Sequence, residues 1–286
     1  MANEPNPHIV WRMDVARGIA SRLASLGGMR AIAVGGSVAR GLADSYSDLE
    51  MLLIWEEQPT DAVRHAIVVD LGATFLYDYN GPACEDNLLL DGLQVDFWHN
   101  TVAHEEAVLD AVLEGYSTDE GDSNFLDTVR ACLPLYGHGI LARWKDGARG
   151  YPDELATRVI TRHIGGFWSG HLEAHAHRDN PTAYYAALCA LQEHLFWVLL
   201  ALNREYYPSQ KWLYAYLERM ATAPPDVAAR LRCTFSAPAD VAGEEMLRLM
   251  SETLDLVEGR FPEVNTGPAR RRLGVRRTPL QPPGVS

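Results

Sequence analysis

Three short groups of residues in the N-terminal third of the chain have the types and spacing needed to bind a metal ion and phosphate. Gly35-Gly36-Ser37 follows one apolar run, Asp48-Leu49-Glu50 opens the next, and Asp96 lies inside a third. Mg²⁺ prefers hard oxygen ligands and commonly uses one or two carboxylates together with substrate phosphates. The three groups therefore indicate phosphoryl-type transfer, in which positioning and charge neutralisation supply most of the catalysis.

The carboxylates are expected to share one site. Side chains alternate across a strand, so Asp48 and Glu50 point to the same face and repel each other unless a cation lies between them. Asp96 is flanked by Val95 and Phe97, and an isolated carboxylate in so apolar a strand needs a partner. We predict Asp48, Glu50 and Asp96 as catalytic residues and ligands of Mg²⁺.

The glycine-serine turn is the expected phosphate site. Gly35 and Gly36 let the backbone approach a ligand closely, and free N–H groups at the start of the following helix can hold phosphate. Ser37 adds a hydroxyl donor, and Arg40 stands one turn later as a second phosphate ligand.

These residues require a sheet to position them. Apolar runs predict strands over 29–34, 48–55 and 73–79, and the turn Asp91-Gly92 predicts a hairpin between 87–90 and 93–98. With helices over 8–26 and 59–71, this part is mixed α/β with about five strands.

Beyond residue 102 the pattern changes to helices. They are expected over 102–113, 125–133, 152–178, 182–203, 209–221, 225–235 and 240–259, with a connection containing one short helix over 134–150. The order of strands and helices predicts an α+β fold. We divide the chain into a sheet domain (1–134), an all-α helical bundle (135–262) and a basic, disordered tail (263–286) that carries Arg270, Arg271, Arg272, Arg276 and Arg277.

Composition limits the partners. The chain is 47% hydrophobic with a net charge of −13, so it is expected to fold as a globular protein that repels nucleic acid and attracts cations. The apolar segment 183–202 carries Gln192, Glu193 and His194, and we interpret it as a buried helix rather than a membrane span. The N-terminus lacks a signal-peptide pattern, which predicts a cytoplasmic protein. The sequence leaves open whether the protein forms a homodimer.

The segment GGSVARGLADSYSDLEMLL resembles the signature of the polymerase-β-like nucleotidyltransferases: glycine and serine, about ten residues, then D-x-D or D-x-E before an apolar strand. Asp96 falls where that family has its third carboxylate. SYSDLEML and GSVAR are similar to segments of the kanamycin nucleotidyltransferases. The motif-level resemblance covers about residues 30–98, and LNREYYPSQKW (202–212) resembles a little-characterised bacterial group.

The resemblance implies an activity and further residues. It implies Mg²⁺-dependent transfer of a nucleoside monophosphate from an NTP, with ATP the expected donor, to a hydroxyl of a small molecule such as an aminoglycoside, and hence a role in antibiotic resistance. Residues 1–134 would be the nucleotidyltransferase domain, and 135–262 would clamp substrate and nucleotide. The family's acceptor-side glutamate matches Glu173, although His177 stands where the family has lysine. Glu193, in an apolar helix, competes for that role, and Lys211 is a candidate phosphate ligand.

Two other classes of function remain open. The same chemistry could act on a metabolite, a natural-product intermediate or a protein side chain, and the motif does not separate these acceptors. A non-catalytic module of antitoxin type could share the fold. Such modules have no need of three carboxylates, which are all present here.

Overall fold

The computed structural model describes residues 6–79, 84–276 and 280–281. By internal contacts the chain divides into two compact units, unit 1 (1–150) and unit 2 (151–286). Unit 1 holds the sheet and unit 2 is helical, so the α+β prediction is confirmed. The division falls after Gly150 rather than after Pro134, because the segment that follows Pro134 pairs with the sheet and packs on its helices.

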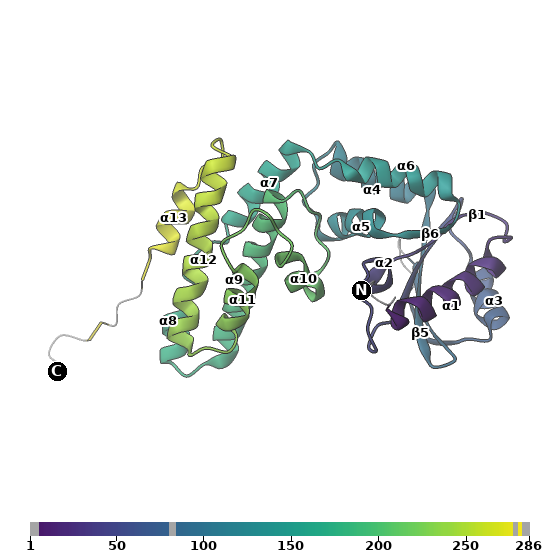
Figure 1. Ribbon diagram of the computed structural model, residues 1–286, viewed down its shortest axis with the longest axis horizontal. Coiled ribbons are helices and arrows are strands. Elements are labelled where there is room, and N and C mark those ends of the chain that lie inside the picture. Colours follow the sequence, from purple (N-terminus) through teal and green to yellow (C-terminus); the bar gives the residue numbers. More distant parts are fainter. Residues whose placement is uncertain (1–5, 80–83, 277–279, 282–286) are drawn as a thin grey trace, which may run out of the picture. The chain divides into compact units, whose positions relative to one another are not determined.

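Unit 1 is a mixed sheet with helices on both faces (Figure 1). The strand order is β3-β4-β5-β2-β1-β6, with β2 and β5 parallel and the other neighbours antiparallel. The strands are β1 (Met29–Val34), β2 (Leu49–Trp55), β3 (Thr74–Tyr79), β4 (Cys84–Leu90), β5 (Leu93–Thr101) and β6 (Leu133–Tyr136). The helices are α1 (Pro7–Leu23), α2 (Gly36–Ala39), α3 (Asp61–Leu71), α4 (Val102–Leu113), α5 (Glu120–Ala131) and α6 (His138–Arg149).

One face of the sheet carries the core of unit 1. The alternate residues Leu49, Met51 and Leu53 of β2 join Val95 and Phe97 of β5 in a buried cluster with apolar side chains of α1 and α3. The intervening residues, including Glu50 and Asp96, therefore point to the opposite face. The opposite face is also partly apolar, since Leu52 and Ile54 of β2 are buried there, and the carboxylates lie towards the start of β2.

The sixth strand corrects the expected count of five. β6 contains Pro134 and pairs with β1 at the edge of the sheet. An edge strand tolerates proline because one side of its backbone needs no partner. The connection expected over 134–150 is accordingly a strand followed by the twelve-residue helix α6.

Unit 2 is built around a long apolar helix. Its elements are α7 (Asp153–Ile164), α8 (Leu172–His177), α9 (Pro181–Leu202), the 3₁₀ helix η1 (Gln210–Trp212), α10 (Leu213–Leu217), α11 (Val227–Thr234), α12 (Ala239–Arg260) and α13 (Gly267–Leu273). α9 is long and apolar enough to span a membrane, yet it packs against α7, α8 and α12, and its Leu188, Leu191 and Leu195 are fully buried. It is the core helix of unit 2.

Three expectations for unit 2 are wrong. The helix predicted over 152–178 is interrupted at Gly165-Gly166, so Glu173 lies on the short helix α8. The helix predicted over 209–221 is shorter and begins as η1. The tail is ordered in part: Arg270 of α13 pairs with Asp255 and Glu258 of α12. Arg277 lies outside the described residues.

Candidate active site

The predicted carboxylates meet on the sheet face opposite the main core. In the parallel ladder between β2 and β5, Glu50 is the register partner of Asp96. Asp48 immediately precedes β2, and its charge acts on Asp96. The structure therefore places the three carboxylates that the sequence singles out on two adjacent strands, with Glu50 beside Asp96 and Asp48 at the start of β2.

Asp96 is the most buried of the three. Only 7% of it is exposed, and burial is the main cause that raises its pKa to about 6, with further contributions from Asp48 and Glu85. Gln94 opposes the rise by donating from Nε2 to both carboxylate oxygens of Asp96, at 3.1 and 3.3 Å. A cation at this position would favour the ionised carboxylate.

A fourth carboxylate, Glu85, belongs to the same cluster and was not foreseen. On β4, Asn87 is the register partner of Asp96, and Glu85 stands two residues away on the same face. Asn87 donates from Nδ2 to Glu85 Oε1 at 2.8 Å. Burial, and then the charges of Glu50 and Asp86, raise the pKa of Glu85. A strict count from the Asp91-Gly92 turn would have found this register.

The glycine turn lies against the carboxylates. Gly36 has φ +58°, and a Cβ atom there would overlap the Glu50 carboxylate. Gly35 N–H donates to the Glu50 carbonyl at 2.9 Å, which ties the turn to β2. Ser37 is 3% exposed, and its hydroxyl has no hydrogen-bond partner among the residues that the structure describes. The turn therefore leaves a buried hydroxyl unsatisfied beside the carboxylates' strand.

Arg40 is engaged elsewhere. Its Nε donates to Asp127 Oδ2 at 2.9 Å, and both side chains are nearly buried, at 6% and 5% exposure. Asp127 lies on α5, so the pair fastens the end of α2 to that helix. This contact gives Arg40 a structural role, and its contact with phosphate stays a prediction.

The carboxylates do not by themselves form a complete metal site. In residues 6–79, 84–276 and 280–281, no three acidic, histidine or cysteine side chains converge as a ready-made metal site. Mg²⁺ sites that use substrate phosphates as ligands need few protein ligands and an open side. The hard-oxygen donors, the close glycine approach and the unsatisfied Ser37 hydroxyl fit such a site.

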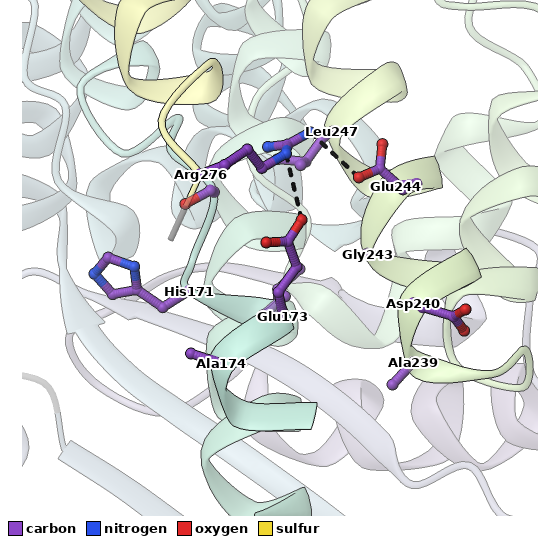
Figure 2. Close-up of a pocket in the computed structure, with 11 residues that line it drawn as sticks. His171, Glu173, Ala174, Ala239, Asp240, Gly243, Glu244, Leu247 and Arg276 are labelled. Atoms are coloured by element: carbon purple, nitrogen blue, oxygen red, sulfur yellow. Dashed lines mark hydrogen bonds and ion pairs between the residues drawn. The ribbon is translucent and has the colours of Figure 1, made fainter. Parts of the chain in front are cut away.

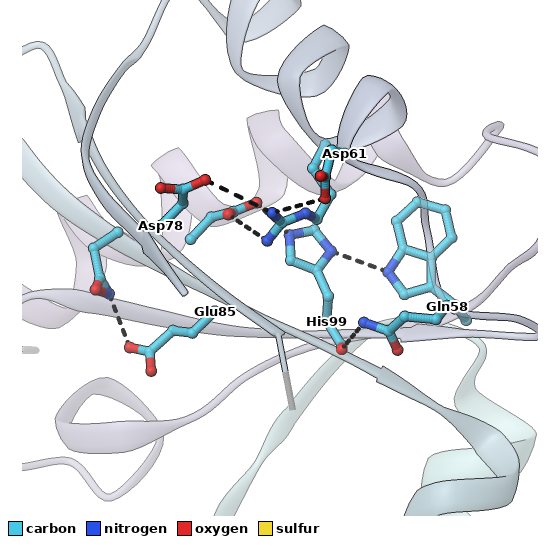
Figure 3. Close-up of polar contacts among 9 residues, drawn as sticks. Gln58, Asp61, Asp78, Glu85 and His99 are labelled. Carbon is cyan, nitrogen blue, oxygen red and sulfur yellow. Dashed lines mark hydrogen bonds and ion pairs between the residues drawn. The ribbon is translucent and has the colours of Figure 1, made fainter. Parts of the chain in front are cut away.

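A buried polar network holds β4 on the face of the sheet opposite the carboxylates (Figure 3). On the core face, Asp86 accepts from Arg64 Nη1 at 2.8 Å and contacts His99 Nε2 at 3.0 Å. Trp55 Nε1 donates to His99 Nδ1 at 3.1 Å, so the neutral ring carries its proton on Nε2 and donates it to Asp86. Asp86 stands between Glu85 and Asn87, and this network therefore holds the strand that presents both residues to the carboxylate cluster.

Unit 2 contains the predicted acceptor-side residues Glu173 and Glu193 and the predicted phosphate ligand Lys211. Glu173 is half exposed and pairs with Arg276 at 3.4 Å in a small pocket that Glu244 also lines (Figure 2). Glu193 lies on α9 beside His194, where its charge raises the pKa of that histidine against the larger lowering effect of burial. Lys211 is exposed on η1, 5.6 Å from the Trp212 ring centre.

Comparisons with known proteins give two likenesses. A protein-family model described as a domain of unknown function (DUF4037) matches residues 129–213. A solved structure of a nucleotidyltransferase-like protein from Exiguobacterium sibiricum is similar, with 14% sequence identity and a TM-score of 0.42, over 88% of this chain and 79% of that chain. No curated protein matches. Neither likeness assigns an activity to this chain.

Proposed function

We propose that the protein is a metal-dependent nucleotidyltransferase, which transfers a nucleoside monophosphate from an NTP, with ATP the expected donor, to a hydroxyl of a small molecule. The observation that carries the proposal is the ladder register of Glu50 with Asp96, with Asp48 one residue before the same strand. Carboxylates on neighbouring positions of one sheet face repel one another, and a bound cation would relieve that repulsion.

Asp48, Glu50 and Asp96 would hold the metal ion, which when bound neutralises phosphate charge and polarises the phosphoryl oxygens. The Ser37 hydroxyl and the backbone of Gly35 and Gly36 would hold phosphate oxygens, because the turn allows close approach and the hydroxyl lacks a partner. Lys211 would contribute a further phosphate contact.

The transfer breaks a phosphoanhydride bond of the NTP and forms a phosphodiester bond to the acceptor. The acceptor oxygen attacks the α-phosphorus, the bond to the bridging oxygen of the β-phosphate breaks, and pyrophosphate leaves. The acceptor's proton passes to a base, for which Glu173 is our first candidate and Glu193 the second. Resemblance to the kanamycin nucleotidyltransferases supports Glu173, and unit 2 would then supply the acceptor side.

A cationic acceptor suits the charge of this protein. The net charge is −13, and Glu85 adds a carboxylate for which the structure, over the part of the chain it describes, gives an amide partner but no ion pair. An amino-alcohol of aminoglycoside type would be attracted by both features. The enzyme would act in the cytoplasm, and its modification of such an antibiotic would make the cell resistant. Nucleic acid and membrane have no part in the proposal.

The direct test is a transfer assay with the full-length protein. The protein is incubated with Mg²⁺, each of the four common NTPs and a panel of amino-alcohol acceptors, and products are read by mass. We expect one acceptor class to gain a nucleoside monophosphate, with pyrophosphate released and the product lost in chelator. Transfer that survives in Asp48→Asn, or that proceeds equally in chelator, would contradict the proposed function.

A further inference from the structure

Arg12 of α1 is a buried cation whose hydrogen bonds go to backbone carbonyls, and its guanidinium also lies 5.0 Å from the centre of the Trp11 ring. It is 2% exposed, yet no carboxylate lies within ion-pair distance of it among residues 6–79, 84–276 and 280–281. Its Nη1 donates to the His8 carbonyl at 3.0 Å, its Nε donates to the Ser47 carbonyl at 3.0 Å, and its Nη2 also donates to Ser47. Burial of a guanidinium costs free energy unless its N–H groups are hydrogen-bonded. Two of the Arg12 donors satisfy this requirement at a single carbonyl, that of Ser47.

The carbonyl that Arg12 holds belongs to the peptide that enters Asp48. The Ser47 C=O and the Asp48 N–H lie in one rigid plane, since the peptide bond has partial double-bond character. A forked pair of donors on that oxygen fixes the direction of the plane and restricts the position of the Asp48 Cα. On the other side of Asp48, Leu49 is fixed by the ladder with Val95. Asp48 is thus held from both ends.

The middle of the loop between α2 and β2, residues 43–47, is held by exposed or half-buried contacts. Asn6 Nδ2 donates to the Ala43 carbonyl at 2.8 Å, and Asp44 accepts from the Tyr46 N–H at 2.9 Å. Ser47 Oγ accepts from the Asp44 N–H at 3.0 Å. These contacts are exposed or half-buried. The loop has two buried attachments to the body of unit 1, the Arg40–Asp127 pair at its start and the Arg12 fork at its end, and only the Arg12 fork adjoins Asp48.

Asp48 needs such an attachment more than its neighbours do. Glu50 and Asp96 lie inside paired strands and cannot withdraw from one another. Asp48 stands at the end of a loop, and its charge opposes that of Asp96. Without an anchor, repulsion would turn Asp48 away from the cluster whenever no cation is bound, and each metal-binding event would have to bring it back.

We propose that Arg12 is a positioning residue, which holds the Ser47–Asp48 peptide so that Asp48 is ready to bind metal. The inference rests on the proposed function, because it takes Asp48 as a metal ligand. Partners that orient metal ligands from outside the site typically change metal affinity by about 10–100-fold when removed. Arg12→Met is expected to weaken Mn²⁺ binding to that extent. Arg12→Lys, which keeps the charge but not the fork, should lie between Arg12→Met and wild type.

The test measures Mn²⁺ affinity of the full-length protein by electron paramagnetic resonance, well below the thermal midpoint of every variant. Met13→Ala is the matched control: it weakens the packing of the same helix in the core but leaves the Ser47 contact in place. Asp48→Asn marks the loss expected when the ligand itself is removed. We expect reduced affinity in both Arg12 variants and wild-type affinity in Met13→Ala.

The outcomes separate the two proposals. If wild type binds no Mn²⁺, or if Asp48→Asn binds it as wild type does, the proposed function fails and the inference falls with it. If Asp48→Asn loses affinity while Arg12→Met and Arg12→Lys retain it, only the role of Arg12 is overturned. Equal losses in Met13→Ala and Arg12→Met would also overturn it, because general loosening of α1 would then explain both. Arg12→Lys keeps the test decisive if Arg12→Met does not fold.

Discussion

Asp96 illustrates how the site depends on single side chains. Burial raises its pKa to about 6, Asp48 and Glu85 add to the rise, and amide donors from Gln94 and Asn87 oppose it. A carboxyl group in that balance is sensitive to any change of charge beside it. The cluster is therefore best tested by removing one negative charge at a time.

The first prediction concerns Asp48. Asp48→Asn removes a metal ligand but also relieves repulsion, so we expect an unchanged or higher thermal midpoint in metal-free protein. Transfer should fall by about 10³-fold, since a metal ion contributes several kcal/mol and each ~1.4 kcal/mol is a factor of ten. The measurement is turnover together with melting curves, with Asp110→Asn, an exposed carboxylate on α4, as control. Near wild-type turnover in Asp48→Asn would refute the metal assignment.

The second prediction compares two adjacent acidic residues. Because the pKa of Glu85 is raised, its ionised form disfavours folding, and Glu85→Gln should raise the thermal midpoint at neutral pH. Asp86 is paired with Arg64 in the interior, so Asp86→Asn should cost about 3–5 kcal/mol, the usual effect of breaking a buried pair. Denaturant unfolding of both variants measures the contrast. Equal destabilisation would show that Glu85 is not under repulsion.

At the scale of elements, the hairpin shows what the sequence could predict. The Asp91-Gly92 turn and the alternation of LQVDFW predict β4, β5 and the orientation of Asp96, and the structure agrees. The same register places Asn87 opposite Asp96, so Glu85 and Asn87 were within reach of the sequence. The buried pairing of Arg64 with Asp86 was not, because it joins α3 to β4 through tertiary packing.

Two elements were predicted wrongly because tertiary contacts override the local sequence pattern. Helical spacing runs through 152–178, but a Cβ at Gly166 would overlap the His194 side chain, and the helix ends before it. His171, at the start of α8, then adopts φ +51°, outside the helical region. Pro134 begins the segment expected as a connection, and it lies instead in an edge strand, where proline is tolerated. The spacing of apolar residues predicts which face of a helix is buried, whereas tertiary packing determines where the helix ends.

The third prediction concerns the attachment of α4 to β5. Glu105 of α4 is 1% exposed and accepts a hydrogen bond from Asn100, and burial raises its pKa from 4.5 to about 8. Between these two values the folded protein keeps a proton that the unfolded chain loses. The free energy of unfolding therefore decreases as pH rises through this window and is steady, as far as this group is concerned, above it.

Glu105→Gln replaces the protonated carboxyl by a neutral group of the same shape. We expect the thermal midpoint of Glu105→Gln to change less with pH between about 5 and 8 than that of wild type, with the largest gain over wild type near pH 8. Melting curves across this range measure the effect, and Glu106→Gln, on the exposed side of α4, is the control. Parallel pH profiles for wild type and Glu105→Gln would contradict the prediction.

At the scale of the whole molecule, the two units have different kinds of candidate residue. Unit 1 carries the carboxylate cluster and the glycine turn, and unit 2 carries Glu173, Glu193 and Lys211. In the proposed reaction, unit 1 holds the metal and most of the phosphate contacts, and unit 2 supplies the acceptor side together with the phosphate contact of Lys211. Substitutions in unit 2 should then change the rate of transfer without changing metal binding.

The last prediction tests this division of labour. Glu173→Gln removes the proposed base and should lower the rate by about 10²–10⁴-fold, the usual scale for such a loss, while NTP and Mn²⁺ binding stay near wild type. Glu193→Gln should do less to the rate and more to stability, because Glu193 lies on the core helix α9. Arg276→Gln is the matched control for Glu173, since it removes the ion-pair partner and leaves the carboxylate. Single-turnover rates at saturating NTP, measured beside melting curves, compare the three. If Glu193→Gln abolishes transfer and Glu173→Gln is nearly silent, the base belongs to α9, and the match of Glu173 to the kanamycin nucleotidyltransferases is wrong.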